Sequence, residues 1–301
     1  MEAPYGLRKV EAQLIIEGFK VLTVDPDRLG LYIDTAHVLG VYTMDPFGLG
    51  PASTTLTKIL KARETCSAKY FRSLLEKPEV LRAKRRGLKI IVGGPGAWQF
   101  RRRLEFVNEH GIDCVIEGEA EKVVGELLRR ALNNQELPRI HDANVKDAPS
   151  VEDIPEIKNP SINGLIEIGR GCCRSCQFCD VTIRPLRWYP YEKILKELKV
   201  NVKAGIRHGV LHAEDVLLYS SKNTVPNREE VLKLHKLCKR FLSNVSWSHT
   251  SMAAIAADPK LIEGVSEILL DGDQEWLGAD VGIETGSPDL VRKIMPAKES
   301  L

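Results

Sequence analysis

Four cysteines fall within eight residues of this 301-residue chain, from Cys172 to Cys179. Free cysteines used only for packing do not cluster in this way. The chain has seven cysteines in all, too few and too unevenly spaced for a disulfide scaffold. Thiolates bind soft metals and iron–sulfur clusters. The cysteine-rich segment therefore predicts a metal centre.

The type of metal centre depends on which thiolates are counted. Counting from Cys173 gives the C-x2-C-x2-C spacing of bacterial ferredoxins, but Ile183 stands where that pattern has its fourth cysteine. This departure weakens the interpretation as an electron carrier. A structural zinc site normally divides its ligands into two separated pairs, and the only later cysteine is Cys238. Zinc is therefore a minor alternative.

Counting Cys172, Cys176 and Cys179 gives C-x3-C-x2-C, with the aromatic residue Phe178 just before the last cysteine. In this motif the chain resembles the radical S-adenosylmethionine (SAM) superfamily. The resemblance implies that the three thiolates hold a [4Fe–4S] cluster and that SAM binds the remaining iron. Reductive cleavage of SAM would then yield a 5′-deoxyadenosyl radical, so the resemblance implies a radical SAM enzyme.

The same resemblance suggests further residues for SAM binding. Glu214 lies where the family often has Gly-Gly-Glu, whose carboxylate meets the methionine amino group, although the two glycines are absent here. Ser248 and Glu284 lie at the ends of later predicted strands, and Phe178 completes the set of candidates. A charge at a helix N-terminus explains Glu284 about equally well, because Ser287 and the proline after it resemble an N-cap and a first helical residue.

The second half of the chain alternates apolar strands with helical patterns, which predicts a partial (β/α) barrel. The cysteines follow its first strand, at the C-terminal ends of the strands where such barrels carry their active sites. The barrel is expected to be truncated, because the chain offers fewer units than the family usually has. Strands are predicted near residues 165–168, 209–213, 245–249 and 279–284, and helices near 190–204, 228–241 and 258–269 and from 288.

The first half also predicts an α/β fold, of the doubly wound (Rossmann-like) type with a parallel sheet. Glycine-rich turns follow two of its strands, at the sheet edge where such folds bind ligands. Helices are predicted over residues 5–18 and about 55–75, and strands over residues 19–24, 38–42, 88–92 and 113–116.

A doubly wound domain before a radical SAM domain resembles the cobalamin-binding subgroup of the superfamily. Glycines at strand ends let the backbone approach a corrin ring closely. A generic turn between a strand and a helix explains the glycines after each of the two strands about as well. The candidates for cobalamin contacts are Thr43, Ser53, Thr54, Gly93, Gly94, Pro95, Glu117 and Gly118.

Composition sets the expected domains, partners and location. We expect a cobalamin-binding-like domain over residues 1–135, a linker rich in Asn, Asp and Pro over 136–160, and a radical SAM domain over 161–301.

The net charge of +2 gives no case for a nucleic-acid partner. No apolar run reaches the roughly 18 residues of a membrane span, and no secretory signal is recognisable, so the expectation is a cytoplasmic protein.

The leading functional hypothesis is a cobalamin-dependent C-methyltransferase. One alternative is a radical SAM enzyme that performs an oxidation, rearrangement or cyclisation without methyl transfer. Another is a non-catalytic iron–sulfur electron carrier. A methylthiotransferase would instead need three N-terminal cysteines, where only Cys66 and Cys114 stand. The radical chemistry implies an electron donor such as ferredoxin or flavodoxin, while the sequence identifies neither the substrate nor a catalytic residue.

Overall fold

The computed structural model describes residues 1–143, 148–179, 181 and 184–299. The chain divides into two compact units, which we call the sheet unit (Gln13–Pro149) and the barrel unit (Met1–Ala12 with Ser150–Leu301). This division differs from the expected boundaries at residues 135 and 161, because the first twelve residues group with the C-terminal part. Lys9 explains this placement: its ammonium group binds Glu197 Oε1 at 2.5 Å and the Pro155 carbonyl at 2.7 Å.

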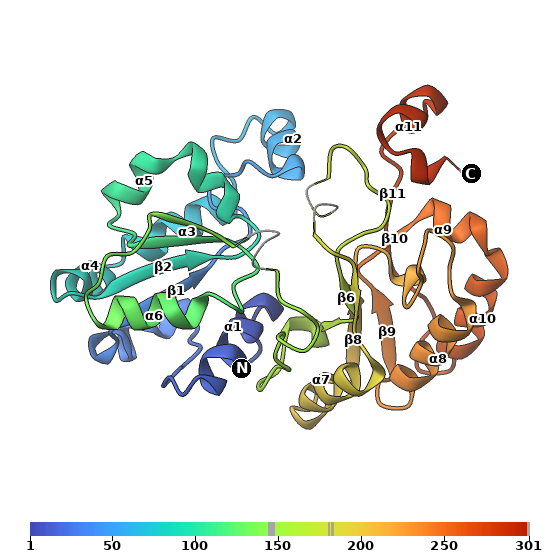
Figure 1. Cartoon of the computed structure of the whole chain (residues 1–301), viewed down its shortest axis with the longest axis horizontal. Coiled ribbons are helices and arrows are strands. Elements are labelled where there is room, and N and C mark those ends of the chain that lie inside the picture. Colours follow the sequence, from blue (N-terminus) through green and yellow to red (C-terminus); the bar gives the residue numbers. More distant parts are fainter. Residues whose placement is uncertain (144–147, 180, 182–183, 300–301) are drawn as a thin grey trace. The chain divides into compact units, whose positions relative to one another are not determined.

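The sheet unit is built on four parallel strands in the order β1-β2-β3-β4 (Figure 1). The successive residues Ile90, Ile91 and Val92 of β2 are all buried, so both faces of the sheet are covered, as is usual for a parallel sheet. The prediction of an α/β fold with a parallel sheet is confirmed. The strands are β1 (Val38–Tyr42), β2 (Lys89–Gly93), β3 (Cys114–Gly118) and β4 (Ile140–Ala143).

Helices and 3-10 turns complete the sheet unit. Helix α1 (Tyr5–Ile16) begins in the barrel unit and ends in the sheet unit. The other helices are α2 (Pro51–Ile59), α3 (Cys66–Leu75), α4 (Pro78–Arg85), α5 (Leu104–Glu109) and α6 (Val124–Leu132), and the 3-10 turns are η1 (Pro26–Leu31), η2 (Ile33–Thr35) and η3 (Ala97–Arg102).

Three segments of the sheet unit differ from the prediction. Residues 19–24 form no strand, so the order of the described strands lacks the reversal that defines a doubly wound sheet. The predicted helix near 55–75 is two helices, because Lys61 has a φ of 51° and Thr65 caps α3 by accepting a hydrogen bond from the Ala68 N–H. Strand β4 lies inside the predicted linker and pairs with β3.

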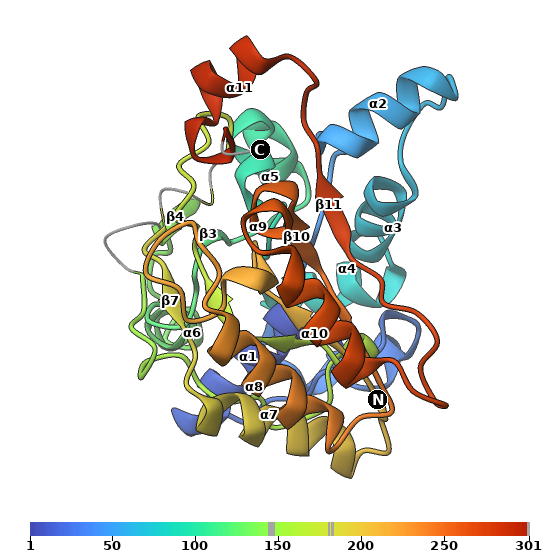
Figure 2. The same cartoon turned by 90° about the vertical axis from the view of Figure 1, so that its right-hand side faces the viewer.

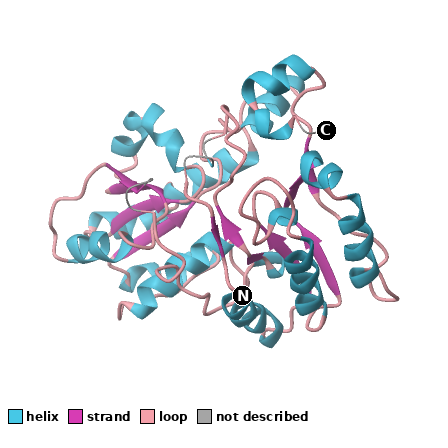
Figure 3. Cartoon of the chain, turned by 45° about the vertical axis from the view of Figure 1, so that its right-hand side comes forward, coloured by secondary structure: helices cyan, strands magenta, loops and turns pink. Residues whose placement is uncertain are grey.

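The barrel unit contains the four predicted strand and helix repeats. Strands β5 (Ile166–Glu167), β8 (His208–His212) and β9 (Asn244–Trp247) form one parallel sheet, and β10 (His249–Ser251) pairs in parallel with β11 (Asp280–Gly282). Figure 3 shows these strands flanked by helices. The helices are α7 (Tyr191–Lys203), α8 (Arg228–Lys239), α9 (Met252–Ala257), α10 (Pro259–Leu269) and α11 (Pro288–Ile294), with 3-10 turns η4 (Ile162–Gly164), η6 (Val216–Leu218) and η7 (Pro296–Lys298).

The core of the barrel unit lies between its strands and its helices. Helices α8 and α10 lie side by side (Figure 2). Both helices bury apolar side chains in the core of the barrel unit. His235 of α8 is fully buried there: its Nδ1 lies 2.7 Å from the Val231 carbonyl oxygen, and its Nε2 accepts a 2.7 Å hydrogen bond from Trp247. No helix among the described residues is long and apolar enough to cross a membrane.

Candidate metal and cofactor site

The cysteines lie on a loop that we call the cysteine loop (Gly171–Cys179). Two short strands frame it: β6 (Gly169–Arg170), which follows β5 closely, pairs antiparallel with β7 (Arg187–Trp188). A Cβ atom at Gly169 would lie 2.3 Å from the Trp188 ring, so only glycine fits there. The cysteine loop therefore begins beyond the C-terminal end of the first barrel strand, as predicted.

The thiols of the cysteine loop are partly shielded from solvent. Cys176 is 6% exposed, while Cys172 and Cys179 are half-buried. Burial raises the pKa of Cys172 to about 11 and also raises the pKa of Cys173 and of Cys176. These thiols therefore keep their protons at neutral pH, and a metal must displace the protons when it binds.

The arrangement of the three thiols bears on the predicted cluster. Three thiols on one short loop are a suitable donor set for the iron of a cluster. Within residues 1–143, 148–179, 181 and 184–299, however, no three His, Cys, Asp or Glu side chains converge closely enough to hold one metal ion. The structure thus brings Cys172, Cys176 and Cys179 onto one loop without gathering them into a ligand set, and their role as ligands stays a prediction.

Cys172 and Cys173 lie in different surroundings. Cys173 packs against the hydrophobic core of the barrel unit, and its Sγ lies 3.5 Å from the Asn223 carbonyl oxygen. Cys172 accepts a 3.5 Å hydrogen bond from the Arg174 N–H and lies within electrostatic range of Glu214. This difference favours the C-x3-C-x2-C spacing over the ferredoxin-like one.

Two of the four predicted SAM contacts lie beside the cysteine loop. Glu214 is exposed and lies within electrostatic range of Cys172, and Glu284 lies within that range of Cys176. Glu284 accepts a 2.6 Å hydrogen bond from Lys298. It precedes α11 by several residues, and it is Ser287 that caps this helix.

The other two predicted SAM contacts differ in their availability. Phe178 projects from the cysteine loop with 56% of its surface exposed. Ser248, between β9 and β10, is engaged by its neighbours: its Oγ lies 2.9 Å from His212 Nδ1 and donates to the Ala213 carbonyl at 3.3 Å. Phe178 therefore has a free ring face, whereas the Ser248 hydroxyl would have to exchange partners to meet a ligand.

A buried polar network that the sequence did not predict lies next to the cysteine loop. Arg174 and Asp215 are 2% and 3% exposed and form an ion pair at 3.1 Å. Thr250 and Ser251 of β10 donate hydrogen bonds to the Asp215 carboxylate at 3.0 and 2.6 Å. The available signal was the second carboxylate in Glu214-Asp215: side chains alternate along an extended segment, so one of the two must point inward.

In the sheet unit, several predicted cobalamin contacts lie together at one edge. Thr43, Gly93 and Gly118 are at or just beyond the C-terminal ends of β1, β2 and β3, which meet at the same edge because the strands are parallel. The Thr43 N–H donates to the Gly93 carbonyl at 2.9 Å. Gly94 has a φ of 108°, and a Cβ atom there would lie 2.6 Å from the Thr43 carbonyl oxygen, so this turn requires glycine.

The remaining cobalamin candidates differ in their surroundings. Glu117 binds Arg101 at 2.5 Å, and the same guanidinium binds Asp142 at 2.7 Å. Ser53 and Thr54 lie on α2, where the Thr54 hydroxyl donates to the Pro51 carbonyl within the helix. Pro95 is exposed beside Gly94.

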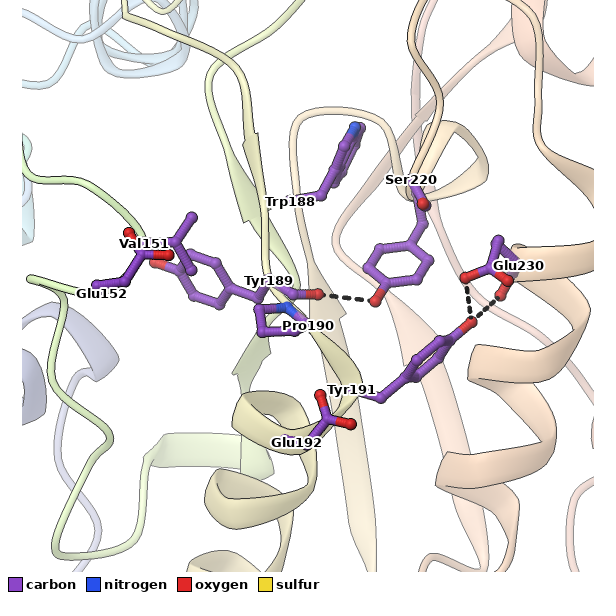
Figure 4. Close-up of a pocket in the computed structure, with 10 residues that line it drawn as sticks. Val151, Glu152, Trp188, Tyr189, Pro190, Tyr191, Glu192, Ser220 and Glu230 are labelled. Carbon is purple, nitrogen blue, oxygen red and sulfur yellow. Dashed lines mark hydrogen bonds between the residues drawn. The ribbon is translucent and has the colours of Figure 1, made fainter.

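The barrel unit also has a cavity of about 380 Å³ outside the cysteine loop (Figure 4). The Tyr219 hydroxyl donates to the Tyr189 carbonyl across this cavity, and the Tyr191 hydroxyl donates to Glu230. Glu192 and Glu230 lie in the first turns of α7 and α8, where carboxylates stabilise a helix. Glu192 and Glu230 therefore have a structural explanation.

Comparison with known proteins gives relatives at low identity. No family model matches the chain. It is 27% identical over 266 residues to an uncharacterised protein of Methanopyrus kandleri, covering 82% of the chain and 44% of the relative. It is 25% identical over 200 residues to a putative methylthiotransferase of Methanocaldococcus jannaschii, covering 62% of the chain and 43% of the relative. The chain thus spans less than half the length of these curated relatives.

A transfer RNA-modifying enzyme, the tRNA-2-methylthio-N(6)-dimethylallyladenosine synthase of Orientia tsutsugamushi, is 24% identical over 182 residues, covering 58% of the chain and 40% of the enzyme. A similar solved structure is the radical SAM methyltransferase TsrM of Kitasatospora setae, with cobalamin and a [4Fe–4S] cluster bound. It superposes with a TM-score of 0.64 at 14% identity, over 98% of this chain and 59% of that one. The resemblance to the radical S-adenosylmethionine superfamily is thus supported by these relatives, and the fold is similar to that of a radical SAM methyltransferase.

Proposed function

We propose that this chain cleaves SAM reductively and transfers a methyl group from cobalamin to a substrate carbon. The observation that carries the proposal is the cysteine loop at the C-terminal end of the first barrel strand. Cys172 is half-buried there near Glu214, while Cys173 packs into the core. That arrangement leaves three thiols for a four-iron cluster and one iron for SAM.

Each cofactor would be held by residues of one unit: the cluster and SAM by the barrel unit, and cobalamin by the sheet unit. Cys172, Cys176 and Cys179 would hold the cluster, which would supply one electron for the reductive cleavage of SAM. Glu214 and Glu284 would orient the amino group of SAM by charge. An external one-electron donor such as ferredoxin or flavodoxin would reduce the cluster.

The edge of the sheet unit would hold cobalamin, which supplies the methyl group. Thr43 and the tight turn at Gly94 place main-chain atoms at that edge. Gly93 and Gly118 extend the same surface along the ends of β2 and β3. A corrin ring is flat and wide, so a glycine-rich edge suits it better than one that carries large side chains.

The cysteine inventory supports methyl transfer over methylthio transfer, although several relatives are methylthiotransferases. Outside the cysteine loop the chain has only Cys66, Cys114 and Cys238. Cys114 and Cys238 are both 0% exposed, so neither thiol is accessible to a cluster. Only the exposed Cys66 remains, so these residues offer no second set of three thiolates.

Anaerobic reconstitution with iron, sulfide and hydroxocobalamin tests the proposal. After desalting, we expect the protein to retain corrin and to show a reduced-cluster electron paramagnetic resonance signal that shifts when SAM is added. Incubation with reductant and SAM should release 5′-deoxyadenosine. A cluster signal that does not shift when SAM is added, with no retained corrin, would leave an electron carrier as the better description. Cluster and SAM cleavage without corrin would favour a radical enzyme that transfers no methyl group.

A further inference from the structure

We propose that Arg174 is the positioning residue of the cysteine loop and holds it in place for the cluster. The inference rests on the proposed function, because it assigns a role towards the cluster. Arg174 lies two residues from both Cys172 and Cys176, and its side chain is 2% exposed. A buried guanidinium within a ligand loop is costly unless its donors are satisfied, so its partners explain why it is there.

The first partner of Arg174 is Asp215, just beyond the end of β8. Arg174 Nε and Nη2 donate to Asp215 Oδ2 at 3.3 and 3.1 Å. Thr250 and Ser251 fix the same carboxylate from β10. Ser251 is itself held, because its Oγ accepts the Ala254 N–H as the N-cap of α9. The guanidinium thus ties the cysteine loop to the C-terminal ends of two barrel strands.

The second partner is the segment that follows α11. Arg174 Nη1 donates to the Ala297 carbonyl at 2.8 Å, and three residues further along the loop the Gln177 N–H donates to the Ile294 carbonyl at 2.8 Å. Met295, between these two acceptors, is only 1% exposed, so the segment is packed. The loop is therefore held on two sides, and Arg174 takes part in both attachments.

The geometry requires an arginine. Three nitrogens of one planar group meet a carboxylate and a main-chain carbonyl that lie in different directions, whereas a lysine ammonium is a single point charge. Holding the loop before the cluster arrives lowers the entropy lost when the thiols close around iron. If the ion pair only stabilised the fold, its removal would lower the melting temperature without a selective increase in the mobility of the cysteine loop.

The test compares Arg174→Met, Arg174→Lys and Asp215→Asn with Arg207→Met, which removes an exposed arginine of the same unit. The first readout is amide hydrogen exchange of the metal-free protein. We expect peptides covering residues 171–179 to exchange at least tenfold faster in Arg174→Met and Asp215→Asn, with α8 peptides unchanged. Arg174→Lys should lie between wild type and Arg174→Met, and Arg207→Met should match wild type.

The second readout is cluster assembly at limiting iron. We expect Arg174→Met to hold less than half of the wild-type iron and sulfide, with a broadened electron paramagnetic resonance signal in the presence of SAM. Unchanged loop exchange in Arg174→Met would overturn the inference, whether or not the protein builds a cluster. Faster exchange throughout the barrel unit would also overturn it, because it would mean a role in general stability. If wild type builds no cluster, the proposed function fails, and loop exchange still decides the role of Arg174.

Discussion

Cys172 and Cys173 are neighbours in the sequence, yet their side chains lie in different surroundings in the barrel unit. The Cys173 side chain packs against the core and its Sγ lies 3.5 Å from the Asn223 carbonyl oxygen, so we expect it to stay outside the ligand set. We expect Cys173→Ala to retain the wild-type amount of iron and sulfide after anaerobic reconstitution. Cys172→Ala should lose most of the cluster, because two thiolates cannot hold the cube firmly.

The two variants serve as matched controls, since each removes one sulfur atom from the same loop. Iron analysis and visible absorbance of the reconstituted proteins measure the outcome. The reverse result, with the cluster kept in Cys172→Ala and lost in Cys173→Ala, would establish the ferredoxin-like spacing instead. It would also remove the main support for the proposed function.

The surroundings of His235 set its pKa and, through it, the dependence of stability on pH. Burial lowers its pKa from 6.5 to about 4, although the hydrogen bond to the Val231 carbonyl opposes this shift. The unfolded chain takes up a proton below about pH 6.5, while the folded chain does not until about pH 4. Stability is therefore complete above about pH 6.5 and falls by up to ~3 kcal/mol towards pH 4, at about 1.4 kcal/mol per pH unit.

Urea unfolding at a series of pH values between 4 and 7.5 checks this slope. His235→Gln should be less stable at pH 7 but should lose much of the decline below pH 6.5, because the titrating group is gone. His208→Gln is the control, since His208 is exposed and its removal should leave the slope unchanged. An unaltered slope in His235→Gln would assign the acid sensitivity to other groups.

At the scale of elements, the buried Lys9 and Glu197 pair attaches the start of α1 to α7. Both side chains are at most 1% exposed, and Glu197 also accepts hydrogen bonds from the Tyr5 hydroxyl and the Ile157 N–H. Removing one partner leaves a buried charge, which costs about 3–5 kcal/mol. We expect Lys9→Met to lower the free energy of unfolding of the barrel unit by that amount in a urea titration.

The exposed pair between Lys196 and Glu156 provides the comparison on the same helix. Lys196 is 65% exposed in its side chain, so Lys196→Met should cost less than about 1 kcal/mol. Combining Lys9→Met with Glu197→Gln should restore part of the lost stability, because no buried charge then remains. Equal effects of Lys9→Met and Lys196→Met would show that α1 contributes little to the barrel unit.

The elements that were predictable from the sequence are those with a strong local pattern. The barrel strands β8 and β9 and the helices α7, α8 and α10 were found within a few residues, because their apolar residues recur with clear periods between turn residues. The cysteine loop was located by spacing alone. The caps at Thr65 and Ser251 were not predicted, although both residue types favour the N-cap position.

The elements that were missed depend on contacts between distant residues. Residues 19–24 alternate like a strand, but Phe19 packs on Arg129 at 5.4 Å and the segment has no strand partner among the described residues. Strand β4 has a polar sequence and exists because β3 offers it an edge. Arg174 and Asp215 are 41 residues apart, so nothing in the local sequence links them.

At the scale of the whole molecule, the candidate groups for the two cofactors lie in different units. The cysteine loop belongs to the barrel unit, and the glycine-rich strand ends belong to the sheet unit. Binding of each cofactor should therefore be separable by mutation. We expect Gly94→Ala to abolish retention of corrin while the cluster content stays within error of wild type, because a Cβ atom would lie 2.6 Å from the Thr43 carbonyl oxygen and distort the edge.

Gly87→Ala is the matched control for this variant. Gly87 has a φ of 100°, close to that of Gly94, but a Cβ atom there meets nothing within 4 Å. Both substitutions impose backbone strain of about 1–3 kcal/mol, so both should lower the stability of the sheet unit in a thermal melt. Only Gly94→Ala changes the shape of the edge, so only it should lose corrin. If both variants lose corrin equally, retention reports the stability of the sheet unit and not a binding edge at Gly94. If both keep it, the corrin lies elsewhere.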